Sequence, residues 1–524
     1  MKTQNTNPSK KDIWLFWGCF AALTATSFGF IVRTQVIGDW GVEFALSETQ
    51  KGEIFGVGLW PFCISIILFS LVIDKIGYGT SMMIALFLHG LSAIITIMAD
   101  GYWMLYWGTF ILALGNGTVE AAINPVVATI FSKEKTKWLN ILHAGWPAGL
   151  ALGGILAILM GPEVSWKWKV ALVLIPVVVY GVMLYGREFP VQERVQAGVS
   201  FKDMLSEAGA VGFFLIFYTV LLEINRVAGL TPLVESNFLS LPHVSLTLSL
   251  ILVSVGYYIY TNSLGRPLFI LLLLIMIPLA TTELGTDSWI TDLMVPFLGN
   301  NAGWVVVYTA MIMVILRFYA GPIVHRTSPL GLLAISSAIA LVGLIILSTA
   351  TGFMIFIAAT IYGLGKTFFW PTMLGVAGER FPKGGALTLN AITGVGMLAA
   401  GIFGTPFLGN IQDKQIDSQL LKQNPAIHAQ VMGQQQTSVF GKYNPLDQEK
   451  VSDLSSSDQD IIAEVQTASK QGALSTVAVF PGIMLICYLG MIGYFRSRGG
   501  YKAINLEDNS LTPQEDISTD GDKA

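Results

Sequence analysis

Long apolar runs separated by polar segments extend along almost the whole chain. The first run begins at Ile13 and continues to about Ile37, and the later runs are of similar length. A helix of about 20 apolar residues crosses the ~30 Å hydrocarbon layer of a membrane. The pattern therefore predicts an all-α, polytopic membrane protein with about 14 transmembrane helices. The predicted spans are residues 13–37, 52–73, 80–99, 103–131, 138–160, 168–186, 208–228, 244–261, 266–285, 302–324, 330–349, 352–378, 386–409 and 473–495.

Polar segments between these runs divide the chain into parts. Residues 187–207 carry much of the mid-chain charge and are predicted to form a cytoplasmic linker. The acidic C-terminal segment lacks the apolar residues that a packed core needs, so we expect it to be disordered. The predicted parts are an N-terminal six-helix half (1–186), the linker (187–207), an inserted helical hairpin of one or two full spans (208–265), a C-terminal six-helix half (266–504) with a long outer loop (410–472), and the acidic tail (505–524).

Composition agrees with a membrane protein and excludes other classes. Charged residues make up 12% of the chain, whereas soluble domains carry about 25%. The net charge of −4 offers no basic face for nucleic acid. Cys19, Cys63 and Cys487 lie within apolar runs, without the spacing of a metal or redox motif. Because the sequence carries no nucleophile–base pair and no phosphate loop, we expect neither an enzyme nor a bound cofactor or metal.

The distribution of Lys and Arg predicts the orientation in the membrane. If the N-terminus is cytoplasmic, the short outer loops hold only Lys51, Lys167 and Lys169, and the other loops hold many more basic residues. Cytoplasmic loops carry such an excess. The first run is too long for a cleavable signal and has no small-residue cleavage site, so it is predicted to be retained. We therefore expect a multi-pass protein of the cell (inner) membrane with both termini cytoplasmic.

The two halves of the chain resemble each other in the order of their motifs. Pro125 in the fourth predicted span is matched by Pro371, at a separation of about 250 residues. Asn140, which follows a leucine in the next span, is matched in the same way by Asn390. The sequence therefore predicts two repeats of six spans, with the hairpin inserted between them.

The loop after the second span carries a motif of charged and small residues. Residues 70–77 read S-L-V-I-D-K-I-G, and their repeat copy, residues 321–326, reads G-P-I-V-H-R. Both resemble the G-x-x-x-D-R-x-G loop of the major facilitator superfamily. The resemblance implies alternating access around a site near the bilayer midplane, and a charge latch in this loop; the simpler interpretation is a positively charged turn. The predicted gating-loop residues are Asp74, Lys75, His325 and Arg326, and we expect a monomer.

A stripe of polar residues lies in the middle of the fourth predicted span. Asn116, Glu120 and Asn124 are four residues apart, so they share one face of the helix. A charge in the hydrocarbon layer costs several kcal/mol unless it faces a cavity or a partner, so Glu120 is predicted to be the proton-coupling group. The alternative is a structural carboxyl that bonds a neighbour. Asn116 and Asn124 are predicted to bind the substrate.

Two short segments resemble one branch of the superfamily, the fucose permease branch of sugar:proton symporters. Residues 115–125 resemble its G-x-x-x-x-E-x-A-x-N-P segment, and residues 139–143 read L-N-I-L-H, similar to its L-N-x-x-Q segment. The resemblance implies that His143 takes the place of a sugar-binding Gln. The branch's acid in span one is not matched, because Thr34 stands near that place, beside Arg33. This departure leaves the coupling ion open; we expect a proton, with sodium as the alternative. Arg33 could bind an anionic substrate, regulate Glu120 or snorkel.

The repeat-mate of the fourth span carries a second polar stripe. Tyr362, Lys366 and Trp370 recur at intervals of four residues and are predicted to line the substrate site. Lys366 could pair with Glu120 or meet a carboxylated substrate. Two other buried charges are Glu283, predicted to bind the substrate, and Arg317.

These patterns lead to one functional expectation with open alternatives. We expect a secondary active transporter in the lipid bilayer, carrying a sugar or related small polar solute by proton-coupled symport. The alternatives are an organic anion or carboxylate transporter and a drug- or peptide-type facilitator.

Overall fold

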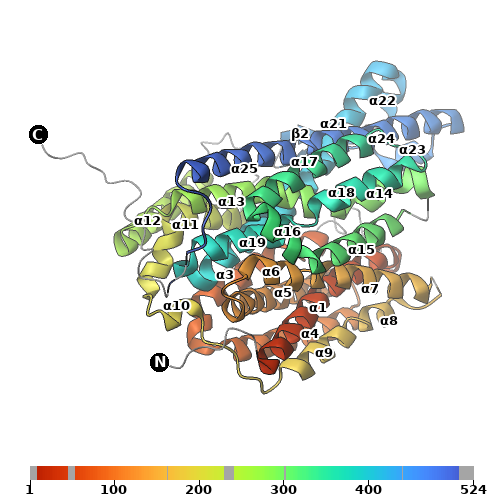
Figure 1. The fold of residues 1–524 in the computed structure, drawn as a ribbon. Helices are drawn as coiled ribbons and strands as arrows, with labels where there is room; N and C mark the ends of the chain where they lie inside the picture. The colour runs from red at the N-terminus through yellow and green to blue at the C-terminus, as the bar shows by residue number, and fades with distance from the viewer. Residues whose placement is uncertain are drawn as a thin grey trace, which may run out of the picture.

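The computed structural model describes residues 9–44, 54–161, 163–228, 241–299, 302–438, 441–504 and 506, and these are almost entirely helical (Figure 1). The first helix begins with a capping box, in which the Ser9 hydroxyl and the Asp12 carboxylate each accept a backbone N–H of the other residue. It extends beyond the predicted span at both ends. The helices of the N-terminal half are α1 (Lys10–Glu43), α3 (Trp60–Ile76), α4 (Tyr78–Ile97), α5 (Tyr102–Ile130), α6 (Lys135–Leu142), α7 (Gly145–Met160), α8 (Trp166–Ala171) and α9 (Leu174–Leu184).

The middle of the chain contains a short linker helix, α10 (Glu193–Gln196), and two long helices, α11 (Phe201–Ala228) and α12 (Leu241–Thr261). α11 kinks at Gly209, whose φ of 61° favours glycine. A Cβ atom at Gly209 would lie 1.9 Å from the backbone nitrogen of Gly265, so the close approach also requires glycine. Because the kink frees backbone groups, Ala210 N–H bonds to the carbonyl of Ser263 at 3.0 Å.

The C-terminal half repeats the helical plan and adds a polar extension. Its membrane helices are α13 (Pro267–Ala280), α14 (Thr286–Leu298), α15 (Trp304–Phe318), α16 (Ala320–Thr327), α17 (Pro329–Leu347), α18 (Met354–Lys366), α19 (Phe369–Arg380), α20 (Gly385–Leu398) and α25 (Val479–Ser497). Two π-helical turns, η1 (Thr281–Gly285) and η4 (Ala399–Gly404), and a 3₁₀ turn, η3 (Pro382–Gly384), interrupt them. The extension comprises α21 (Thr405–Gln423), α22 (Pro425–Val431), β1 (Gln436–Ser438), β2 (Gly441–Tyr443), α23 (Gln448–Ser452) and α24 (Ser456–Val477).

The number of spans agrees with the sequence. Among the described residues, 11 helices are long and apolar enough to cross a membrane, or 12 if α15 and α16, bent by 67°, form one span. Adding α12 and the broken pair α18–α19 to these 12 gives the predicted 14. The predicted fold class, an all-α polytopic membrane protein, is confirmed.

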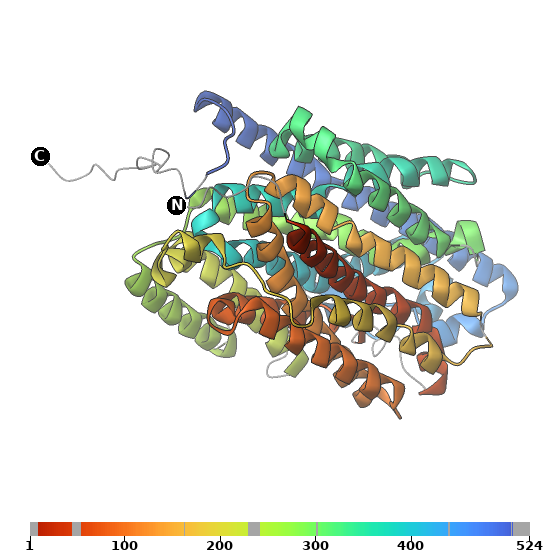
Figure 2. The ribbon, with the colours of Figure 1, turned by 60° about the horizontal axis from the view of Figure 1, so that its bottom comes forward.

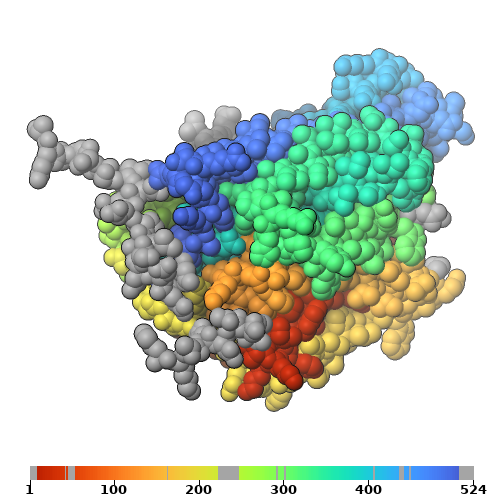
Figure 3. All heavy atoms as spheres, in the orientation of Figure 1, coloured from red at the N-terminus to blue at the C-terminus, as the bar shows by residue number. Residues whose placement is uncertain are grey.

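The two halves lie side by side, with the N-terminal half in red to yellow and the C-terminal half in green to blue (Figures 1 and 2). α1 begins and α25 ends at the same side of the bundle, which we call the terminal face (left in Figure 1). The polar extension projects at the opposite end, as the space-filling view also shows (Figure 3). It is mainly helical rather than an irregular loop, and Leu420, Val431 and Ile462 form part of its own small core.

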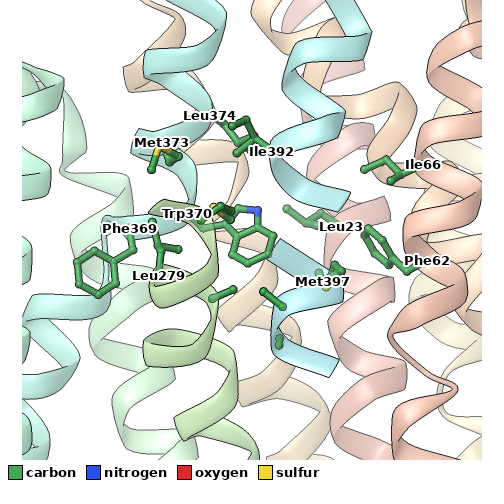
Figure 4. Packing of buried hydrophobic residues seen from close by; sticks show 14 of the residues in the cluster. Leu23, Phe62, Ile66, Leu279, Phe369, Trp370, Met373, Leu374, Ile392 and Met397 are labelled. Carbon is green, nitrogen blue, oxygen red and sulfur yellow. The ribbon is translucent and has the colours of Figure 1, made fainter. Parts of the chain in front are cut away.

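The halves meet where α3 packs against α20 and α7 packs against α15. Figure 4 shows Leu23, Phe62 and Ile66 of the N-terminal half facing Trp370 and Met397 of the C-terminal half. Helices within a half approach closely at glycines, as is common in membranes. A Cβ atom at Gly149 of α7, for example, would lie 2.4 Å from the carbonyl oxygen of Thr24 in α1.

Candidate functional site

Glu120 lies in the middle of α5 and is 1% exposed. The Asn124 amide, one helical turn later, donates to its carboxyl oxygen Oε2 at 2.9 Å. The Asn124 carbonyl oxygen lies 3.0 Å from Nε2 of His143, which therefore donates to it. The predicted residues Glu120, Asn124 and His143 thus form one hydrogen-bonded row. Within the described part of the chain, no basic side chain forms an ion pair with Glu120.

Asn116 faces a different helix from the rest of the predicted stripe. Its side-chain oxygen lies 3.0 Å from Nε2 of His89 in α4, and the other ring nitrogen of His89 lies 3.0 Å from the hydroxyl of Tyr180. All three side chains are buried. The stripe therefore divides, because Asn116 stabilises the packing of α4 and α9 against α5, whereas Glu120 and Asn124 lie beside α6.

Arg317 of α15 connects the two halves. Its Nη2 forms a 3.0 Å ion pair with Glu283, and its Nε donates to the carbonyl of Thr367 at 2.7 Å. Its Nη1 donates to the backbone carbonyl of His143 at 2.6 Å. That carbonyl lacks the usual helical donor four residues later, because Pro147 has no N–H. The break between α6 and α7 thus exposes a backbone acceptor that the opposite half uses.

Lys366 is paired within its own half. Its amine forms an ion pair with Asp287 and lies 5.0 Å from the centre of the Tyr362 ring. The suggested pairing of Lys366 with Glu120 is therefore not formed. Sequence reasoning missed Asp287, although it follows Glu283 by one helical turn. That spacing of two acids in an apolar run was the available signal.

The remaining predicted residues of this stripe are held by packing or backbone contacts. The Tyr362 hydroxyl donates to the carbonyl of Thr282 at 2.6 Å. Trp370 is 5% exposed, and its ring packs so closely on α20 that a Cβ atom at Gly396 would lie 2.5 Å from it. Figure 4 shows the ring among apolar side chains that include Leu279 and Met397.

Arg33 is buried within the N-terminal half rather than snorkelling outward. It is 4% exposed, and its guanidinium carbon lies 5.7 Å and 6.0 Å from the ring centres of Phe30 and Phe55. It lines a cavity together with residues of α4, α5 and α8. The structure therefore does not bring Arg33 into the row that contains Glu120.

The first copy of the predicted gating loop is paired with the linker. Asp74 forms an ion pair with Arg194, and Gln192, with its amide oriented to satisfy both atoms, donates to Asp74 Oδ1 at 2.8 Å. The same Gln192 accepts from the backbone of Ala386 in α20. Lys75 is exposed. The linker thus joins the end of α3 to the opposite half, and sequence reasoning missed Arg194 because its partner is 120 residues away.

The second copy also reaches across the halves, through a weaker contact. His325 lies 3.1 Å from Glu134, and Arg326 is exposed. Partial burial raises the pKa of Glu134, but the charges and hydrogen bonds of Lys137 and His325 outweigh it, so that its pKa lies below the usual range. Because the pair is largely exposed, its contribution is about 0–1 kcal/mol.

Further contacts close the terminal face. Lys135 forms a 2.6 Å ion pair with Glu193 of the linker and donates to the carbonyl of Gly378 in α19 at 3.3 Å. Thr136 donates to Glu379, whose second oxygen accepts the Tyr501 hydroxyl at 2.9 Å. The segment after α25 therefore lies against this inter-half contact. These pairings could not be predicted from the sequence, because the charged residues that form them lie in polar segments outside the apolar runs.

Repeat-related asparagines also bridge the halves. The Asn140 amide donates to Thr372 of α19 at 3.2 Å. The Asn390 amide donates to Ser70 of α3 at 2.8 Å and to the carbonyl of Ala121 in α5 at 3.1 Å. Both side chains are fully buried, so the repeat places equivalent polar contacts on both sides of the interface.

Comparison with known families agrees with this architecture. The family model described as Major Facilitator Superfamily matches residues 14–405. The chain belongs to the major facilitator superfamily. It is therefore a transporter of the multi-pass membrane type, and its predicted resemblance to this superfamily is confirmed.

Several solved facilitators share the fold of this facilitator at low sequence identity. The fucose:proton symporter of E. coli is 14% identical, with a TM-score of 0.54, covering 91% of this chain and 99% of its own. A proton:xylose symporter is 12% identical, with a TM-score of 0.61, covering 96% and 99%. The human organic anion transporter MFSD10 is 10% identical, with a TM-score of 0.56, covering 91% and 99%. A search of curated protein sequences finds no significant match.

Proposed function

We propose that this facilitator is a secondary active symporter that couples a neutral small polar solute, such as a sugar, to protons. The observation that carries the proposal is the setting of Glu120. Its buried carboxyl is hydrogen-bonded to Asn124 and has no basic partner among the described residues. An ionised carboxylate is unfavourable in such surroundings, so a carboxyl of this kind carries a proton when closed off and can release it when water reaches it.

The hydrogen-bonded row gives the proton site a connection to substrate. Asn124 contacts both Glu120 and His143, and the backbone of His143 contacts Arg317 of the other half. A solute that draws the Asn124 amide away from Glu120 would remove the donor that favours the ionised form of the carboxyl. Binding of solute and binding of a proton would then favour each other, as symport requires.

A neutral solute fits the charges at the interface better than an anion does. Lys366 is neutralised by Asp287, and Arg317 is neutralised by Glu283. An anionic solute would have to displace one of these carboxylates. Among the described residues, the organic anion and carboxylate alternative therefore lacks an uncommitted cation beside the row that contains Glu120. The drug- or peptide-type facilitator stays the second alternative, because these ion pairs do not bear on it.

The experiment uses purified protein reconstituted in proteoliposomes. A thermal-shift panel of neutral sugars and small carboxylates first selects a solute, because a ligand that binds the folded state raises Tm. We expect Glu120→Gln to abolish accumulation driven by an inward proton gradient while it retains solute exchange, because the amide mimics a permanently protonated carboxyl. A parallel sodium gradient tests the other coupling ion.

The matched control is Glu188→Gln, which neutralises an exposed glutamate of the linker region. It should accumulate solute like the parent protein. Proton-driven accumulation that persists in Glu120→Gln would remove Glu120 from the mechanism. Accumulation driven by sodium alone would show that the coupling ion is sodium and not a proton.

A further inference from the structure

A small cavity lies inside the N-terminal half, away from the interface between the halves. Its volume is about 30 Å³. Its walls come from α1, α4, α5 and α8, and from Val173, which directly precedes α9. Arg33 and Trp40 line it from α1, and Thr109 lines it from α5. A cavity of this size accommodates one particle of the size of a water molecule or slightly larger.

Arg33, which lines this cavity, has unused hydrogen-bond donors in its guanidinium. Its Nε and Nη1 are buried and have no hydrogen-bond partner among the described residues. The Trp40 Nε1, from two turns further along α1, is likewise buried and without a described partner. An isolated buried cation is highly unfavourable unless an anion or a set of acceptors compensates it.

The nearby acids of α1 do not supply that compensation. Asp39 lies 3.7 Å from Lys169, and Glu43 accepts a hydrogen bond from Trp166. His89, which also lines the cavity, is bonded through both ring nitrogens to Asn116 and Tyr180. The described wall therefore offers Arg33 aliphatic side chains, serine and threonine hydroxyls, and the rings of Trp40 and His89, but no carboxylate.

Gly58 shows that the guanidinium is enclosed on its other side. A Cβ atom at Gly58 would lie 2.4 Å from Arg33 Nη2, so only a glycine leaves room for the side chain there. The rings of Phe30 and Phe55 lie near the same group. Arg33 is thus fixed by packing where it lines the cavity, and two of its donors are unpaired among the described residues.

We propose that this cavity binds one small monovalent anion, of the size of chloride or formate, on Arg33, with the Trp40 N–H as a second donor. The anion supplies the negative charge that the described wall lacks. Because the cavity lies within one half, the bound anion is separate from the solute at the interface. The inference is therefore independent of the proposed symport and survives if that proposal fails.

The test measures Tm of the purified full-length protein at constant ionic strength. Chloride or formate replaces gluconate, which is too large for the cavity. The parent protein should show a saturable rise in Tm with chloride, with formate, or with both, and the two titrations distinguish the inorganic anion from a carboxylate. Arg33→Gln should lose the saturable response. Trp40→Phe, which keeps the ring but removes its N–H, should raise the half-saturating concentration roughly tenfold or more.

Arg187→Gln is the matched control, because Arg187 is an exposed arginine beside Trp14. It should respond to anions like the parent protein. If Arg33→Gln does not fold, equilibrium binding of radioactive chloride or formate to the parent protein and to Arg33→Lys decides the matter, with about one anion per chain expected for the parent. Absence of binding to the parent protein, or an equal response in the parent protein and Arg33→Gln, would overturn the proposal.

One further variant tests whether the chain supplies the anion itself. Glu53 precedes the described residues that pack around Arg33. If the parent protein binds neither anion but Glu53→Gln binds one, a carboxylate of the chain occupies the cavity and the proposal is wrong. If the proposal holds, Glu53→Gln should bind anions with an affinity close to that of the parent protein.

Discussion

At the scale of single residues, the C-terminal half carries one buried and one largely buried ion pair on neighbouring helices. Glu283 pairs with Arg317, and Asp287 pairs with Lys366. The sequence predicted that Glu283, Arg317 and Lys366 are buried, because each stands in an apolar run. It could not predict their partners, since pairing depends on how three helices rotate toward one another.

The Asp287–Lys366 pair leads to a prediction about stability. Lys366→Met should destabilise the protein strongly, by about 3–5 kcal/mol, because it leaves the largely buried Asp287, whose side chain is 11% exposed, without its partner. The double variant Lys366→Met with Asp287→Leu should regain most of this loss, because both charges are removed together. Thermal unfolding of the single and double variants in one detergent measures the difference. A double variant as unstable as the sum of the two singles would show that the side chains do not act as a pair.

At the scale of helices, the apolar runs predicted where spans lie but not where they break. The span predicted at 138–160 divides between Leu142 and Gly145, and the span predicted at 352–378 divides between Lys366 and Phe369. Pro147 was a visible signal for the first break, since proline lacks the N–H of a helix interior. Pro371 stands in the same place relative to the second break, because the carbonyl of Thr367, four residues before it, lacks a helical donor and accepts from Arg317 instead.

Close packing of α1 against α7 gives a prediction at this scale. Gly149→Ala should lower stability by about 1–3 kcal/mol, because the added methyl group would lie 2.4 Å from the Thr24 carbonyl and 2.0 Å from the Ser27 hydroxyl oxygen. Gly90→Ala in α4 is the matched control, since no heavy atom lies within 4 Å of its new methyl group. Unfolding temperatures of both variants check the prediction. Equal values would contradict a tight contact at Gly149.

At the scale of the whole molecule, the internal repeat predicted the two six-helix halves. The spacing of Asn140 and Asn390 was part of that signal. Their hydrogen bonds across the interface were not predictable, because the repeat shows equivalence but not which helices meet. The ion pair between Arg194 of the linker and Asp74 was not predictable for the same reason. The polarity of the segment 410–472 predicted its location outside the hydrocarbon but not its helices.

Orientation in the membrane remains a prediction that one experiment checks. Single cysteines placed at Ser456 in the extension and at Lys75 near the terminal face should react differently with a membrane-impermeant reagent added to intact cells. The extension should be labelled and the terminal face should not, because the Lys and Arg bias predicts cytoplasmic termini. Cys487→Ala provides the background, since Cys19 and Cys63 are buried. Labelling only at Lys75→Cys would invert the orientation.

The central claim is that solute and proton move together through Glu120. The most direct measurement records external pH while solute is added to proteoliposomes in weak buffer, without a pre-formed proton gradient and with the membrane potential clamped. Inward movement of the solute should make the medium more alkaline in the parent protein, and Glu120→Gln should transport the solute down its gradient without this change. Solute entry without alkalinisation in the parent protein, or the same alkalinisation in Glu120→Gln, would contradict the account.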